Sequence, residues 1–130
     1  MKKLLLILFV LTTVLFSACK KTENSNPKLA VDYTKPENLS GTTWKYFYTG
    51  TSPSLEWASL VFKSTSAVEG WSKYKNQNET KDWTGSFAII NTTITFNYVM
   101  DSVPETFSGT ISGESMTCLM GGTTITFKKQ

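Results

Sequence analysis

The side chains that most often perform catalysis are scarce in this 130-residue chain, which contains no histidine and no arginine. Arrangements in which histidine activates a serine or a cysteine, or binds a metal, are therefore excluded. Two cysteines without histidine are too few for a typical zinc site. A hydrolase that uses two carboxylates would need folding to bring two scattered acids together. We expect a non-enzymatic protein with no catalytic residue, no metal and no cofactor. The scattered acids between residues 40 and 130 are Glu56, Glu69, Glu79, Asp82, Asp101, Glu105 and Glu114.

Cys19 ends a segment that has the features of a secretory signal peptide: a basic start, an apolar run over residues 4–11 and small residues before the cysteine. The run is too short to span a bilayer, which takes about 20 apolar residues. Phe16-Ser17-Ala18-Cys19 resembles a bacterial lipobox, whose cysteine is lipidated and becomes the first residue of the mature chain. We therefore predict a lipoprotein signal peptide over residues 1–18. Lipidated Cys19 would anchor the protein in the cell envelope, in the outer membrane, facing the periplasm or the outside.

The predicted mature chain is nearly balanced in charge. Without Lys2 and Lys3, 11 lysines remain against 10 acidic residues, a net charge of about +1. Nucleic acids are normally bound by a clustered basic face, so we expect no nucleic-acid partner. The second cysteine, Cys118, has no partner within the chain if Cys19 carries lipid, and it is interpreted as a small buried hydrophobic residue.

The mature chain divides into a tether over residues 19–39 and one domain over residues 40–130. The tether is polar and contains Asn and Pro, which keep such a segment from burying much apolar surface. Within it, Leu29, Val31 and Tyr33 alternate with other residues, so this piece is expected to reach the domain surface.

The domain is predicted to be an all-β, eight-stranded antiparallel up-and-down barrel. Short runs rich in Thr, Val, Ile and aromatic residues alternate with period two. Their connections are too short for parallel crossovers, and closing sequential antiparallel strands removes exposed edges. The runs cover residues 42–49, 55–63, 68–75, 83–90, 93–98, 105–112, 115–120 and 123–129.

Alternate loops of such a barrel lie at opposite ends. The first, third and fifth loops, over residues 50–54, 76–82 and 99–104, are predicted to be long, and the second, fourth and sixth are tighter. The tether would arrive at the closed end, so the loop-rich end should point away from the membrane.

Several of these runs carry a family resemblance. The stretch from Leu39 to the C-terminus resembles the lipocalin-like (calycin-type) lipoproteins of Bacteroidetes. Two residues rather than one separate Gly41 from Trp44, and a lysine replaces the late arginine of many lipocalins. The resemblance implies an eight-stranded barrel with room for a small apolar site. It rests on Leu39-Ser40-Gly41-Thr42-Thr43-Trp44, Leu60-Val61-Phe62-Lys63, Gly85-Ser86-Phe87-Ala88-Ile89, Ile94-Thr95-Phe96 and Ile125-Thr126-Phe127-Lys128-Lys129.

The leading site hypothesis is the loop-rich rim. An eight-stranded barrel is just wide enough to be filled by side chains or to hold one small ligand. Tyr48, Tyr74, Trp83 and Tyr98 are the ligand-binding candidates, because aromatic rings with a polar atom suit a small apolar or amphipathic molecule. The alternative is that these four side chains fill the opening at the loop-rich end of the barrel and leave no space for a ligand. The predicted inward-facing residues are Trp44, Tyr46, Tyr48, Leu60, Phe62, Tyr74, Phe87, Ile89, Ile94, Phe96, Tyr98, Phe107, Ile111, Met116, Ile125 and Phe127.

A second hypothesis places a protein or glycan partner on the outside of the barrel. The expected register puts Phe47 opposite Trp57 on the outer face, with Val61 further along the strand. Clustered exposed aromatic residues mark interaction surfaces. The alternative is that residues 29–33 of the tether cover this patch.

Overall fold

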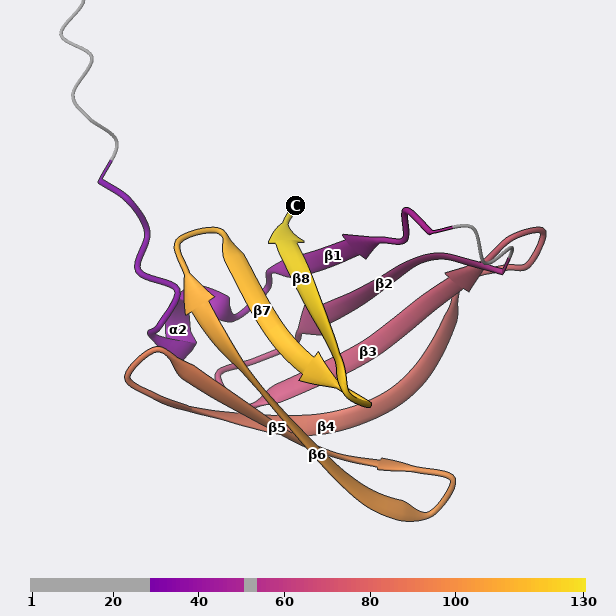
Figure 1. The fold of residues 1–130 in the computed structure, drawn as a ribbon. Helices are drawn as coiled ribbons and strands as arrows, with labels where there is room; N and C mark the ends of the chain where they lie inside the picture. Colours follow the sequence, from indigo (N-terminus) through magenta and orange to yellow (C-terminus); the bar gives the residue numbers. More distant parts are fainter. Residues whose placement is uncertain (1–28, 51–53) are drawn as a thin grey trace, which may run out of the picture.

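A computed structural model describes residues 29–50 and 54–130, which form a closed antiparallel barrel with strands in sequence order (Figure 1). The all-β up-and-down prediction is confirmed. Cys19, the signal peptide and the first part of the tether lie outside the described residues. The elements are the one-turn helix α2 (Pro36–Leu39) and the strands β1 (Thr43–Phe47), β2 (Leu55–Phe62), β3 (Ala67–Tyr74), β4 (Thr80–Ile90), β5 (Thr93–Met100), β6 (Val103–Ser112), β7 (Ser115–Met120) and β8 (Thr123–Lys129).

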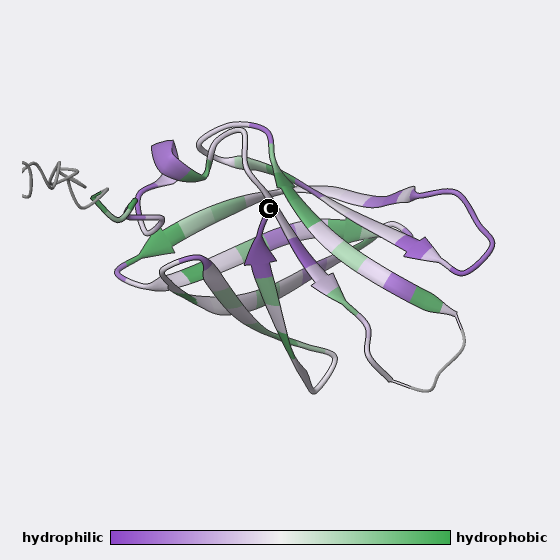
Figure 2. Cartoon of the chain, turned by 90° about the horizontal axis from the view of Figure 1, so that it is seen from above, coloured by the Kyte–Doolittle hydropathy of each residue, from purple (hydrophilic) through white to green (hydrophobic). Residues whose placement is uncertain are grey.

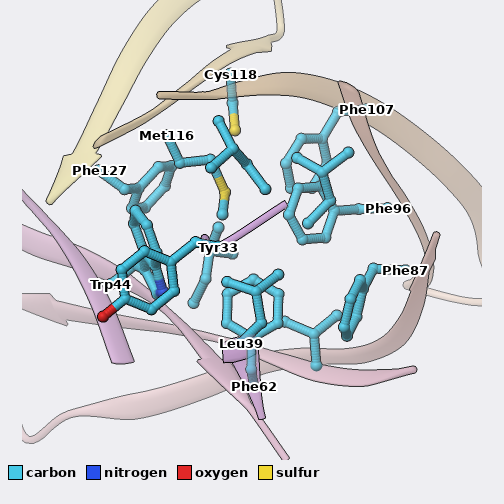
Figure 3. Packing of buried hydrophobic residues seen from close by; sticks show 14 of the residues in the cluster. Tyr33, Leu39, Trp44, Phe62, Phe87, Phe96, Phe107, Met116, Cys118 and Phe127 are labelled. Atoms are coloured by element: carbon cyan, nitrogen blue, oxygen red, sulfur yellow. The ribbon is translucent and has the colours of Figure 1, made fainter. Parts of the chain in front are cut away.

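The alternation of apolar and polar residues fills the barrel. Bands of hydrophobic and hydrophilic residues follow one another along the strands (Figure 2), since successive side chains of a strand point to opposite faces. Side chains from around the barrel meet at its centre (Figure 3), where Phe96 stacks on Phe107 with ring centroids 4.5 Å apart. Burying each such side chain contributes about 1.5–3 kcal/mol, so this cluster is a main source of stability. The buried inward set includes Trp44, Leu60, Phe62, Val68, Phe87, Ile94, Phe96, Phe107, Ile111, Met116, Cys118 and Phe127.

The segment before β1 closes one end of the barrel. Leu39 of α2 is fully buried, and Tyr33 is nearly so. The Tyr33 ring packs edge-on against Trp44, with centroids 5.3 Å apart, and Trp44 Nε1 donates a hydrogen bond of 2.9 Å to Thr42 Oγ1. Tyr33 and Leu39, which the sequence places in the tether, are therefore part of the core.

The opposite end is loop-rich but differs from the prediction at the fifth loop. The predicted loop over residues 99–104 is wrong: β5 and β6 continue to Met100 and Val103, joined by Asp101-Ser102, both with positive φ. Pro104 favours a loop in the sequence because it lacks an N–H. It is tolerated in β6 because the β6–β7 pairing ends at Ser108 and Leu119, so Pro104 lies on an unpaired strand edge.

The barrel is splayed at this loop-rich end. Strands β1 and β8 pair only near the closed end, through Trp44 with Lys129 and Lys45 with Lys128. The β5–β6 hairpin projects past the turn between β7 and β8 (Figure 1). We call this end of the barrel, opposite the closed end, the open end. The described loop residues 48–50 and 54, and the loop over residues 75–79, lie there, as the sequence predicts for the first and third loops.

Candidate functional site

Three aromatic rings form the inner surface just below the open end. Trp83 of β4 lies 4.6 Å from Tyr98 of β5 and 5.9 Å from Phe107 of β6, measured between ring centroids. Tyr98 and Phe107 are themselves 5.7 Å apart. Two of the four predicted rim residues, Trp83 and Tyr98, are thus brought together, and Phe107 joins them from the predicted core.

Trp83 reaches this position because of Gly70 and a bulge. The pairing of β3 with β4 shifts register between Gly70 and Trp71, which leaves Asp82 as an extra residue in β4. A Cβ built on Gly70 would overlap Cε2 and Nε1 of the Trp83 indole. Gly70 therefore does not open space for a ligand; the indole occupies that space, and Trp83 is only 7 % exposed.

Around these rings, apolar side chains that point into the barrel are only partly buried. We call this surface the cup, and it comprises Tyr46, Ala58, Tyr98, Met120 and Ile125, contributed by β1, β2, β5, β7 and β8. Inward-facing side chains deeper in the barrel, such as Trp44, Leu60 and Phe127, are buried, and Ile89 near the closed end is also only partly buried. The described residues therefore leave partly exposed apolar side chains, inside the barrel, at this end. Met120 and Ala58 are not among the site residues expected from the sequence, although the period-two pattern places Met120 on the inner face.

The other two rim candidates lie apart from these rings. Tyr48 follows β1, its N–H donates a 3.0 Å hydrogen bond to the carbonyl of Glu56, and its ring lies against Gly50. Tyr74 ends β3 and is 39 % exposed. Within the described part of the chain, neither ring packs on Trp83 or Tyr98. They belong to the rim rather than to the floor of the cup.

Two carboxylates lie at the cup. Ser72, an inward residue that is nearly fully buried, donates a 3.0 Å hydrogen bond to Asp82 Oδ1. Glu105 lies directly across from Tyr98 in the β5–β6 pairing. Burial, and secondarily the negative charge of Glu105, raise the pKa of the Tyr98 hydroxyl above its usual value, so Tyr98 is neutral at physiological pH. Neither carboxylate forms an ion pair with any described residue.

The structure shows the expected pairing on the outer face, but only one of its two aromatic rings is exposed. Phe47 pairs with Trp57 as expected, and Phe47 is 56 % exposed. Trp57 is largely buried, and the Lys45 ammonium lies 4.0 Å from its ring centroid. Trp57, Val61 and Trp71 line an open groove on the outer face of the barrel, with a volume of about 280 Å³.

Charged groups border this groove. Trp71 Nε1 donates a 3.1 Å hydrogen bond to the Glu69 carboxylate. The same carboxylate forms an ion pair with Lys81, whose Nζ lies 3.4 Å from Glu69 Oε1. The hydrogen bond from Trp71 is the main reason that the pKa of Glu69 lies below its usual value; partial burial opposes this and Lys81 adds to it. The groove therefore combines indole rings with a fixed carboxylate.

The tether does not cover this patch. Leu29 and Val31 are exposed, and Tyr33 packs against Trp44 inside the closed end rather than on the outer face. Residues 29–33 also take no part in lining the groove. The alternative in which the tether hides Phe47 and Trp57 is thus wrong for the described residues.

Cys118 faces the interior and is buried, which raises the pKa of its thiol to about 12. A protonated thiol is a poor nucleophile and a poor metal ligand. Across residues 29–50 and 54–130, no group of three potential His, Cys, Asp or Glu ligands lies close enough to hold a metal. In the same ranges no helix has the length and apolar character needed to cross a membrane.

Comparisons with protein-family models, with curated proteins and with solved structures gave no match to this chain.

Proposed function

We propose that this protein is a lipid-anchored, non-enzymatic binding barrel of the lipocalin-like type, which takes a small apolar or amphipathic ligand into the cup at its open end. The observation that carries the proposal is the cup itself. Inward-facing Tyr46, Met120 and Ile125 remain partly exposed although equivalent side chains deeper in the barrel are fully buried. Concave apolar surfaces with a few polar groups are the usual form of small-molecule sites.

The proposed location in the cell envelope rests on the signal-peptide pattern of the sequence. Cys19 would carry the lipid, and the anchor would hold the protein in the outer membrane of the cell envelope. One acyl chain gives only marginal attachment, so stable anchoring needs several chains. The closed end carries the segment that leads back to Cys19, so the cup would face away from the membrane. A Cys19→Ala variant should be released from the membrane or remain unprocessed; stable membrane attachment of its mature form would contradict the lipobox.

The binding proposal is tested with two matched variants of the full chain. Ala58→Phe places a ring in the cup, whereas Ala88→Phe places the same ring on the exposed outer face of β4. Native mass spectrometry of protein purified from its own cells should show a bound small molecule in the wild type and in Ala88→Phe. Ala58→Phe should lack it. A ligand that persists in Ala58→Phe, or no ligand in any of the three proteins, would contradict the proposal.

The exposed ring of Phe47, next to the largely buried Trp57, favours a second candidate function, contact with a glycan or a protein on the outside of the barrel. Phe47 contributes an exposed aromatic ring, and the neighbouring groove supplies the Glu69 carboxylate, which the hydrogen bond from Trp71 Nε1 holds in place, as a polar partner. Binding to a glycan array by the wild type and by Phe47→Tyr, but not by Phe47→Ala, would support it. Equal signals from the two variants would argue against this surface.

A further inference from the structure

The ionisable side chains are distributed unevenly between the two faces of the barrel. Every lysine of the strands has its ammonium on the outer face or at the closed end. Lys75, in the loop after β3, is exposed at the open end. The observed placements are Lys45 over Trp57, Lys73 against Glu56, Lys81 against Glu69, Lys128 against Ser115, and Lys129 over the Tyr33 ring at the closed end.

The charges nearest the cup are negative. Asp82 is held at the inner face by the hydrogen bond from buried Ser72, and Glu105 stands opposite Tyr98. Both residues are exposed, and within residues 29–50 and 54–130 neither carboxylate forms an ion pair. Glu56 and Glu69, by contrast, are each paired with a lysine. The cup therefore combines an apolar interior with two carboxylates that form no ion pair with any described residue.

The rings beneath this rim also favour a cation. The faces of Trp and Tyr rings carry negative electrostatic potential and attract an ammonium within about 6 Å of the centroid. Trp83 and Tyr98 are stacked at a tilt of 34°, and Tyr98 remains partly exposed. An ammonium above Tyr98 would be close to Glu105 as well, because the two residues are direct partners across β5 and β6.

We propose that the ligand of the cup is an amphipathic cation, an apolar group that carries an ammonium. Glu105 would attract the ammonium above Tyr98, and Asp82 would add a second negative charge at the rim. The apolar group would lie against Met120 and Ile125. This inference rests on the proposed function, because it names the chemical class of ligand for the same cup. An anionic amphiphile such as a fatty acid would be repelled by the two carboxylates.

The test uses three six-carbon probes that differ in charge: hexyltrimethylammonium, hexanol and hexanesulfonate. Their affinities for the full chain are measured by isothermal titration at low and high salt. We expect the ammonium to bind most tightly and to be the only probe weakened by salt, because screening acts on the charged pair. Glu105→Gln and Asp82→Asn should each weaken the ammonium about two- to fivefold, as for a partly exposed ion pair. Neither should change hexanol binding.

The variants are chosen to preserve the fold. The amide introduced by Asp82→Asn keeps an oxygen that can accept the hydrogen bond from Ser72, and Glu105 is exposed. Glu114→Gln, in the turn at the closed end, is the matched control and should leave all three affinities unchanged. Equal binding of the three probes, or ammonium binding that is insensitive to both variants, would overturn the charge inference and leave the proposed cup intact. If none of the probes binds, the proposed function fails and the inference fails with it.

Discussion

Replacing Gly70 with alanine tests whether the Trp83 indole is fixed inside the barrel. The added methyl group would overlap Cε2 and Nε1 of Trp83. The indole has little room to move away, because it is only 7 % exposed and is packed between Tyr98 and Phe107. The substitution must therefore either displace the ring or shift β3 relative to β4.

The expected loss of stability can be estimated from two opposing effects. Overpacking a filled core typically costs about 1–3 kcal/mol. Replacing a glycine also restricts the unfolded chain, which returns about 0.4–1 kcal/mol. We expect Gly70→Ala to lower the free energy of unfolding by about 1–2 kcal/mol, which corresponds to a decrease in Tm of about 4–16 °C for a domain of this size.

The measurement is guanidinium chloride unfolding in a double-mutant cycle with Trp83→Leu. Leucine lacks the atoms that meet the new methyl group, so Gly70→Ala should be neutral or slightly stabilising in that background. The coupling free energy between the two positions should be about 1–2 kcal/mol, within the range measured for residues in contact. Far-ultraviolet circular dichroism follows the transition, because one of the tryptophans is changed in the cycle.

Two results would refute this account. Gly70→Ala with unchanged or higher stability would mean that the indole does not occupy the space above Gly70. An equal loss in the wild-type and Trp83→Leu backgrounds would assign the effect to the strand backbone rather than to the ring. Either outcome would also weaken the proposed cup, since Trp83 forms part of its floor.

Three further predictions concern the closed end, a turn and the thiol. Leu39→Ala should lower the free energy of unfolding by about 2–5 kcal/mol although Leu39 lies outside the strands, because it is fully buried; a loss below about 1 kcal/mol in thermal unfolding would contradict its place in the core. Ser102→Gly should raise stability by about 0.5–1 kcal/mol in the same assay, because Ser102 has a φ of 67°, which glycine adopts without strain; no gain would mean that the turn is not strained. Folding raises the pKa of the Cys118 thiol from 9.0 to about 12, so this group's contribution to stability is present below about pH 9 and is lost between about pH 9 and 12. Native protein should accordingly resist labelling by Ellman's reagent at pH 8, and rapid labelling would show that the thiol is accessible. In Cys118→Ala, the part of the loss of stability above pH 9 that the thiol causes should disappear.

The sequence by itself determined the architecture. Period-two alternation identified the strands, and short connections left antiparallel neighbours as the available pairing. The register of Phe47 with Trp57, which the sequence predicts if Thr49 pairs with Leu55, is confirmed. These features are local, so a pattern read along the chain is sufficient to predict them.

The tertiary structure decided what fills the barrel and what remains open. The inward position of Trp83 depends on a bulge at Asp82 and on the missing side chain of Gly70, two residues on different strands whose contact no local pattern reveals. Tyr33 and Leu39 become core residues only because the segment before β1 folds back over Trp44. The cup exists because the pairing of β1 with β8 ends early, and strand pairing between the two ends of a chain is set by long-range contacts.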